Sequence, residues 1–315
     1  MRVVFMGTPE FALPCLEALV RSKHKPVGVV SAPPKPAGRG QKVKSSPVEV
    51  RARELGLAVQ TPERLNDTGF LGWLRDLNPD VAAVVAFRYL PREVFALPRK
   101  GSVNLHASLL PKYRGAAPIN WAIYNGERKT GVTTFLLDDR VDTGAILAQR
   151  ECPIGPDETA GELAEKLSRL GAELLLETLD GLEAGTLIPV PQTEAGVTLA
   201  PKLKKEDGFI LWERPALQVH NQIRAFSPAP GAFGKLGGEV IKIYRSRVLP
   251  SDAKNTAKRP GSWLCFDGRT GLAVCCGEGG VEILELSLEG RKKLTGPEFA
   301  RGQKRLADKT FELKI

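Results

Sequence analysis

Short apolar runs alternate with stretches of helical apolar spacing through the first 185 residues. Apolar runs predict strands, and a period near 3.6 predicts helices between them. The predicted strands cover residues 2–6, 27–32, 81–87, 103–105, 131–137 and 145–149, and the predicted helices cover residues 11–20, 48–55, 70–77, 119–124 and 159–182. This alternation is typical of an α/β domain with a Rossmann-like, mainly parallel sheet covered by helices on both faces.

Two of the predicted helices carry capping signals at their starts. Thr8 followed by Pro9 reads as an N-cap and a first helical residue, so we expect the first helix to begin there. Thr159 and Glu162 have the spacing of a capping box, in which side chain and backbone satisfy each other. Both signals place a helix directly after a turn.

The pattern changes near residue 187. Residues 187–203 are punctuated by proline, threonine and glycine, which predicts an extended linker. One helix is expected at residues 216–225, followed by β-like runs at 240–244, 262–266, 272–275 and 281–286. Short strands separated by glycine-rich turns favour a small OB-like β-barrel. The predicted organisation is an α/β domain at 1–188, a linker at 189–205 and a barrel domain at 206–315.

Residues 31–47 fit neither pattern. The segment is rich in proline, glycine and basic residues and contains no acid. We expect a long exposed loop, and loops of this length are either functional or flexible insertions.

The charge is unevenly distributed. The net charge is +9, and residues 201–315 hold 21 basic against 13 acidic residues, so +8 of it lies in the last third. Such an asymmetry favours a polyanionic partner, most often nucleic acid, although a basic surface that only aids solubility remains open.

Composition also indicates the cellular compartment in which the protein is expected to act. No apolar run is long enough for a membrane span, and the first residues lack the layout of a secretory signal. The five cysteines are scattered and show no zinc or disulfide spacing. We therefore expect a cytoplasmic protein with reduced cysteines and no membrane partner.

Only three histidines are present. His24 lies in a charged stretch expected to be exposed, and His220 lies in a helical, mostly apolar stretch expected to pack. His106 follows an apolar strand, and strand alternation puts Asn104 and His106 on one face. Ligands bind at the carboxyl ends of strands in open parallel sheets, so this pair is the candidate site. A purely structural histidine remains an alternative.

Two further segments add chemistry near this pair. Residues 108–115 mix apolar, basic and aromatic side chains, as expected of a wall for a planar ligand. Asp142 lies in an Asp-Thr-Gly turn after a strand. Aspartic proteases use two such turns in an all-β fold, and a single copy in an α/β domain does not fit that class.

These residues carry a resemblance. The segments GTPEF at 7–11, PAGRG at 36–40, NLHASLLPKYRGAAPI at 104–119, DTG at 142–144 and RAFSPAPGA at 224–232 occur in this order along the chain. Together they resemble the methionyl-tRNA formyltransferase family. The sequence departs from the family's usual pattern at three positions: Leu137 and Arg140 stand near the aspartate turn where Met and Gly are usual, and Ala229 stands where Trp is usual.

The resemblance implies formyl transfer from 10-formyltetrahydrofolate, the co-substrate, to the α-amino group of methionyl initiator tRNA. It implies catalytic roles for Asn104, His106 and Asp142, and no metal. The implied folate-binding residues are Ser108, Leu109, Leu110 and Pro111, and the implied tRNA-binding residues are Arg39, Lys42 and Lys44. The protein is expected to act as a cytoplasmic monomer.

Three alternatives stay open. A glycinamide ribonucleotide or aminosugar formyltransferase would share Asn104, His106 and Asp142, but would not need a basic barrel. A nucleotide-cofactor dehydrogenase is disfavoured because the first turn lacks the G-x-G-x-x-G spacing. A non-catalytic RNA-binding protein is disfavoured by the intact set of three polar residues.

Overall fold

The computed structural model describes residues 1–37, 42–250 and 258–313. Contacts group the chain into two compact units, neither of them continuous in sequence. The N-terminal unit comprises Met1–Pro118, Lys129–Pro153 and Ala164–Pro201, and the C-terminal unit comprises Ile119–Arg128, Ile154–Leu163 and Lys202–Ile315. The continuous domain limits proposed from the sequence stay a prediction.

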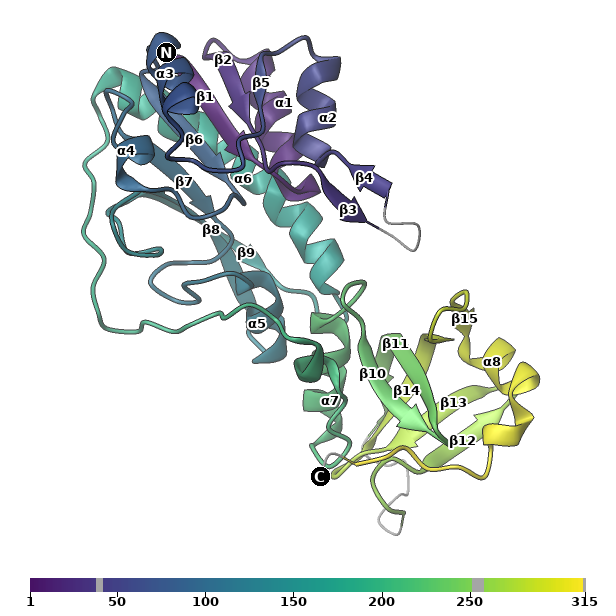
Figure 1. The fold of residues 1–315 in the computed structure, drawn as a ribbon. Coiled ribbons are helices and arrows are strands. Elements are labelled where there is room, and N and C mark those ends of the chain that lie inside the picture. The colour runs from purple at the N-terminus through teal and green to yellow at the C-terminus, as the bar shows by residue number, and fades with distance from the viewer. Residues whose placement is uncertain (38–41, 251–257, 314–315) are drawn as a thin grey trace. The chain divides into compact units, whose positions relative to one another are not determined.

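The N-terminal unit contains a seven-stranded sheet in the order β5-β2-β1-β6-β7-β8-β9. Its strands are β1 (Arg2–Gly7), β2 (Lys25–Val30), β5 (Val59–Gln60), β6 (Val81–Val85), β7 (Ser102–His106), β8 (Lys129–Leu136) and β9 (Ile146–Pro153). The five strands from β5 to β7 pair in parallel, while β8 and β9 pair antiparallel at one edge. The predicted Rossmann-like, mainly parallel sheet is confirmed (Figure 1).

Helices cover both faces of this sheet. They are α1 (Leu13–Arg21), α2 (Pro47–Glu54), α3 (Thr68–Asp76), α4 (Arg92–Phe95) and α6 (Ala160–Ala184). On one face, α3 and α4 pack into a core with Val4 and Val84. On the other face, α6 lies so close to β7 that a Cβ on Gly171 would stand 2.5 Å from Leu105 Cδ2. Leu105 therefore points to α6, and its neighbours in the strand point away from it.

The first helix does not begin where the Thr8 signal predicts. Residues Glu10–Ala12 form a 3₁₀ turn, and α1 begins at Leu13 with no side-chain cap from Thr8. Pro14 explains the difference, because its ring clashes with the carbonyl four residues earlier and restricts it to the first turn of an α-helix. The N-cap prediction at Thr8 is wrong.

The capping box at the start of α6 is confirmed. The Glu162 amide donates to Thr159 Oγ1 at 3.3 Å, and the Thr159 amide donates to Glu162 Oε2 at 2.9 Å. This reciprocal pair fixes the turn that precedes the longest helix of the protein.

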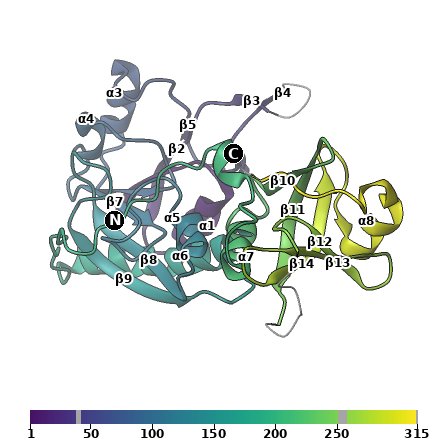
Figure 2. The ribbon, with the colours of Figure 1, turned by 90° about the horizontal axis from the view of Figure 1, so that it is seen from below.

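The segment at residues 31–47 is less irregular than predicted. It contains a small antiparallel pair formed by β3 (Lys35–Ala37) and β4 (Lys42–Lys44). In both views this pair projects from the body of the N-terminal unit (Figure 1, Figure 2). Its exposed position agrees with the predicted surface loop, but the pairing of β3 with β4 gives part of this loop a regular structure.

The C-terminal unit is built on a six-stranded antiparallel sheet in the order β10-β11-β14-β13-β12, with β15 paired to β14. The strands are β10 (Ala232–Leu236), β11 (Glu239–Val248), β12 (Trp263–Asp267), β13 (Gly271–Cys275), β14 (Gly280–Leu288) and β15 (Leu294–Thr295). The unit also contains α5 (Pro118–Tyr124, from Ile119 onward), α7 (Ala216–Ala225) and α8 (Gly296–Gly302). The predicted C-terminal β domain is confirmed as a sheet of antiparallel strands, and the helix at 216–225 is confirmed. The closure of this sheet into an OB-like barrel stays a prediction.

Buried polar residues of α7 bind the turn at 155–158 in this unit. Arg224 is 6% exposed and donates to the main-chain oxygens of Gly155 and Glu158 at 3.2 and 3.0 Å. His220 is 3% exposed, and its ring nitrogens lie 3.0 Å from Ser246 Oγ and from the Pro156 carbonyl oxygen. The expected packing role of His220 is confirmed.

The cysteines behave as buried apolar residues, with one exception. All five are free thiols; Cys265 is partly exposed and the other four are buried. Burial raises the pKa of Cys15 to about 12.

Among the described helices, none has the length and apolarity needed to cross a bilayer.

The burial of His220 predicts a pH dependence of stability. Burial lowers the pKa of its imidazole, so the folded state holds fewer protons than the unfolded state, where the pKa is about 6.5. The stabilising effect is present above that value and is lost as the pH falls through the folded pKa. The free energy of unfolding of the wild-type protein, measured relative to that of His220→Gln, is therefore expected to fall as the pH is lowered from about 7.5 to 5. Urea titrations followed by tryptophan fluorescence measure it, and a difference independent of pH would contradict it.

Candidate active site

Strand β7 places Asn104 and His106 on the same face of the sheet. Asn104 pairs with Val84 of β6, whose side chain belongs to the core under α3 and α4, while Leu105 faces α6. Asn104 is partly exposed, and within residues 1–37, 42–250 and 258–313 its side-chain amide has no hydrogen-bond partner. An amide with two free donors is suited to bind a ligand oxygen.

The imidazole of His106 is held from one side by main chain. His106 is 6% exposed, and its Nε2 lies 2.8 Å from the carbonyl oxygen of Tyr113. Because a carbonyl only accepts, Nε2 carries a proton and donates it. The second nitrogen, Nδ1, lies 3.7 Å from Asp142 Oδ2. Nδ1 is therefore the nitrogen that is available for proton transfer, with a carboxylate beside it.

Asp142 reaches His106 through a loop that folds back over the sheet. At the end of β8, the amide of Leu137 donates to Ser102 O at 2.8 Å, at the first residue of β7. Five residues later, Asp142 Oδ2 accepts from the amide of Gly115 at 2.8 Å and faces His106 at the last residue of β7. The loop after β8, a strand that runs antiparallel to β7, therefore spans the length of β7 and brings Asp142 to the histidine at its end.

The backbone of this loop is tightly constrained. Asp142 has a φ of 55°, in the left-handed region that few residues other than glycine adopt readily. A Cβ on Gly144 would stand 1.7 Å from the Leu136 carbonyl oxygen, so only glycine fits there. Arg140 keeps a negative φ and an exposed side chain, and its position in the turn is compatible with a residue larger than glycine.

Side chains of β8 and β9 stabilise the loop that follows β7 through hydrogen bonds to its main chain. Thr133 Oγ1 donates to Ser108 O at 2.6 Å, and Gln149 Nε2 donates to Leu110 O at 2.8 Å. The hydroxyl of Ser108, which is fully buried, donates to Lys112 O at 2.6 Å. The side chains of Ser108 and Leu110 are thus buried within the loop and stabilise it, while the side chains of Leu109 and Pro111 are partly exposed. Sequence reasoning missed Thr133 and Gln149, because nothing along the chain marks them as partners of this loop.

The three basic residues expected to contact tRNA belong to one segment. Lys42 and Lys44 are the first and last residues of β4, and Lys44 is exposed. Arg39 lies outside the described residues. The N-terminal unit thus presents part of this segment on the projecting β3–β4 pair, and the assignment stays a prediction.

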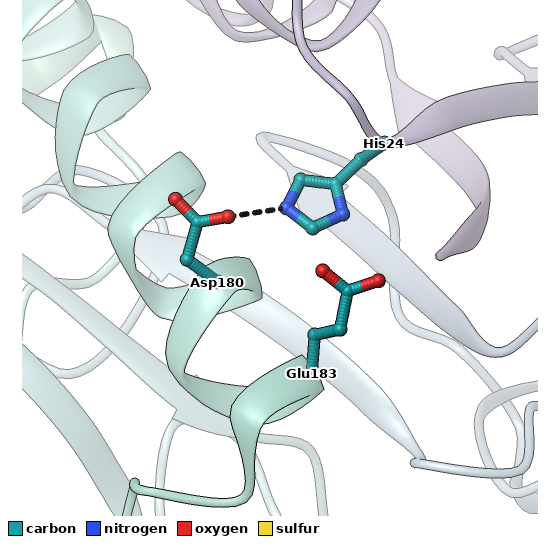
Figure 3. Close-up of side chains that lie close together, drawn as sticks. All are labelled: His24, Asp180 and Glu183. Atoms are coloured by element: carbon teal, nitrogen blue, oxygen red, sulfur yellow. Dashed lines mark hydrogen bonds and ion pairs between the residues drawn. The ribbon is translucent and has the colours of Figure 1, made fainter.

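His24 is not exposed as the sequence suggested. It is 1% exposed, and its Nε2 lies 3.0 Å from Asp180 Oδ1 on α6 (Figure 3). His24, Asp180 and Glu183 place possible metal-ligand atoms within 4.8 Å of one another. However, the Lys23 ammonium lies 2.9 Å from Asp180 and 3.1 Å from Glu183, and the Met1 amino group lies 3.0 Å from Glu183. These cations already pair with both carboxylates, so the cluster fastens α6 to the start of the chain.

Comparison with known proteins agrees with this fold. The formyl transferase family matches residues 1–179, and the formyl transferase C-terminal domain family matches residues 202–304. A solved structure of HypX from Aquifex aeolicus in complex with tetrahydrofolic acid has a similar fold, with a TM-score of 0.67, 20% identity, and coverage of 98% of this chain and 48% of that chain. The chain is therefore a formyl transferase that has both family domains.

Curated relatives narrow the class further. Methionyl-tRNA formyltransferase of Solibacter usitatus is 47% identical over 306 residues, which cover 96% of each chain. Methionyl-tRNA formyltransferase of Synechococcus sp. (strain JA-3-3Ab) is 47% identical over 320 residues, which cover 99% of each chain. This chain belongs to the methionyl-tRNA formyltransferase family.

The free amide of Asn104 yields a test of the site. Removing one donor to a developing oxyanion typically lowers kcat by roughly 10²–10³-fold. Asn104→Ala is expected to cause a loss of this size in formyl transfer, with thermal unfolding close to that of wild type because the amide has no hydrogen-bond partner among the residues that the structure describes. Asn66→Ala, at an exposed loop position, is the control and should keep full activity. Near-normal turnover of Asn104→Ala would remove Asn104 from the catalytic set.

Proposed function

We propose that Asn104, His106 and Asp142 catalyse the transfer of a formyl group from 10-formyltetrahydrofolate to the α-amino group of methionyl initiator tRNA. Membership in the family makes the chain a methionyl-tRNA formyltransferase, an enzyme of translation initiation. The observation that carries the catalytic assignment is the approach of Asp142 Oδ2 to His106 Nδ1, at 3.7 Å, beside the strand face that also bears Asn104.

The three groups suit the charges that this reaction develops. 10-Formyltetrahydrofolate supplies the formyl group as co-substrate. Asn104 donates a hydrogen bond to the formyl oxygen, which gains negative charge as the methionyl amine attacks. His106 delivers a proton from Nδ1 to the leaving nitrogen, since its Nε2 is occupied by the Tyr113 carbonyl. Asp142 accepts, through a bridging water, the proton that the amine loses and passes it to Nδ1 of His106, so the proton given to the leaving nitrogen is replaced and both side chains return to their starting states.

The loop after His106 is the proposed folate-binding element. Ser108, Leu109, Leu110 and Pro111 form a turn whose main chain is fixed by Thr133 and Gln149. A fixed turn of this kind offers preorganised main-chain groups and the partly exposed apolar surface of Leu109 and Pro111 to a planar ligand. The relative with bound tetrahydrofolic acid has the same fold, which supports folate use. We expect no metal requirement, because amide and imidazole donors can stabilise the oxyanion.

The acceptor side is proposed to involve both units. Arg39, Lys42 and Lys44 belong to the segment around the projecting β3–β4 pair, and the excess positive charge of the chain lies in residues 201–315. Lysine and arginine side chains bind phosphates without reading sequence. We propose that these charges hold the tRNA backbone, and that the protein works as a monomer in the cytoplasm.

A direct assay of acceptor choice tests the function. Purified protein is supplied with 10-formyltetrahydrofolate and, separately, with charged initiator methionine tRNA, charged elongator methionine tRNA, glycinamide ribonucleotide and a nucleotide-linked aminosugar. Formylation of the initiator tRNA well above the other three is the expected result. Transfer to either free amine at a comparable rate would assign the chain to a different formyltransferase class.

The binding of tRNA is expected to weaken steeply with salt. In a plot of log affinity against log salt concentration, each phosphate contact contributes a slope of about −0.7 to −0.9. Lys44→Ala should weaken binding and reduce that slope by about one. Lys129→Ala is the matched control, because Lys129 is exposed and pairs with Glu151 at 2.7 Å. An affinity that does not change with salt would contradict a backbone-binding role for these charges.

A further inference from the structure

The segment predicted as a linker lies along the loops of the candidate site. Val190 forms a two-way main-chain bridge with Ile146, both hydrogen bonds being 2.8 Å long. Farther on, the Arg114 amide donates to Thr198 O at 2.9 Å, and the Ala200 amide donates to Arg114 O at 2.7 Å. Residues 190–200 are thus fastened at one end beside the aspartate loop and at the other end beside the histidine loop.

Gln192 bridges these two loops through its side chain. Its Nε2 donates to the carbonyl oxygens of Asp142 and Gly144, at 3.0 and 2.9 Å. Its Oε1 accepts from Nε and Nη2 of Arg114, at 3.1 and 2.8 Å. A guanidinium only donates and a carbonyl only accepts, so the amide fits in one orientation alone.

The two loops that Gln192 joins hold the two halves of the catalytic pair. Asp142 belongs to the first loop, and its left-handed backbone is held at the carbonyl by Gln192. Arg114 directly follows Tyr113, whose carbonyl orients His106, and precedes Gly115, whose amide orients the Asp142 carboxylate. A shift of Gln192 would therefore displace the loops of both Asp142 and His106 and change the distance between the two side chains.

We infer that Gln192 is a positioning residue for formyl transfer, which keeps the Asp142 carboxylate aimed at His106 Nδ1 by tying the aspartate loop to Arg114. This inference rests on the proposed catalytic roles of Asp142 and His106. Gln192 does not touch the reacting atoms; it acts through Asp142. Displacement of a catalytic group by about 1 Å can cost roughly 100-fold in rate, so the effect should be measurable.

Two variants separate the two halves of the bridge. Gln192→Glu keeps an acceptor for Arg114 but turns a carboxylate oxygen toward the carbonyls of Asp142 and Gly144, which repel it. Gln192→Met keeps the length of the side chain and removes all its hydrogen bonds. Gln60→Glu, at an exposed position of the same unit, is the matched control for the charge change.

The assay is steady-state formylation of charged initiator tRNA by the full-length protein, with circular dichroism and thermal unfolding to measure the folded fraction. Both Gln192 variants are expected to lower kcat by roughly 10- to 100-fold while KM for the tRNA changes much less. Gln60→Glu should match wild type. A role in stability alone would lower the folded fraction and leave kcat per folded molecule unchanged, and that result would overturn the proposal.

A double-mutant cycle with Asp142→Asn tests whether Gln192 acts through Asp142. Residues that act as a unit give effects that do not multiply. The loss caused by Gln192→Met should shrink to nearly none when Asp142→Asn is already present. An equal loss in both backgrounds would show that Gln192 acts elsewhere. Failure of wild-type protein to formylate the tRNA would instead contradict the function itself, so the two failures are distinguishable.

Discussion

The candidate site depends on the fold-back of the loop between β8 and β9. Asp142 can face His106 only because this loop crosses the length of β7 and returns. The crossing requires main chain to pass main chain at Gly144, where a Cβ would stand 1.7 Å from Leu136 O. It also requires Asp142 itself to adopt a left-handed backbone, with a φ of 55°. The contact between the carboxylate and the imidazole follows from these two local constraints.

Main-chain atoms orient both partners of that contact. The carbonyl of Tyr113 fixes Nε2 of His106, and the amide of Gly115 fixes the carboxylate of Asp142. Main-chain groups of a packed loop lose little freedom when a substrate binds, so they are suited to hold a site in its reactive geometry. The loop is in turn supported by Thr133 and Gln149 beneath it. The side chains proposed to be catalytic therefore rest on a layer of residues that take no part in the proposed chemistry.

Polar residues of the C-terminal unit fall into two groups, one buried and one exposed. Arg224 and His220 are buried and satisfy the main chain of residues 155–158, so these polar side chains contribute to structure. Most of the unit's other basic side chains are exposed, as expected for a surface that meets a polyanion. Arg224 belongs to the segment that resembles the family, yet its contacts in this unit are structural. Resemblance at a residue thus does not by itself distinguish binding from packing.

Local sequence patterns were sufficient to predict the alternation of strands and helices, the mainly parallel sheet, the β-rich C-terminal domain and the placement of Asn104 and His106 on one strand face. These features follow from local periodicity, which short-range sterics and burial impose on every strand and helix. The Thr8 signal predicts the wrong start for α1, because Pro14 is restricted to the first turn of the helix, which therefore begins at Leu13. Local pattern also misjudged His24, because a polar stretch of sequence does not reveal that α6 covers it with Asp180.

Tertiary structure alone decided which distant groups meet. Asp142 approaches His106 across 36 residues of sequence, and Gln192 joins their loops from a segment that reads only as a linker. Such contacts depend on loop paths, and these are set by close backbone passages and by hydrogen bonds between residues far apart in the chain. A single sequence holds no periodic signal for them. The strand face that bears the site was therefore predictable, while the geometry around Asp142 required the fold.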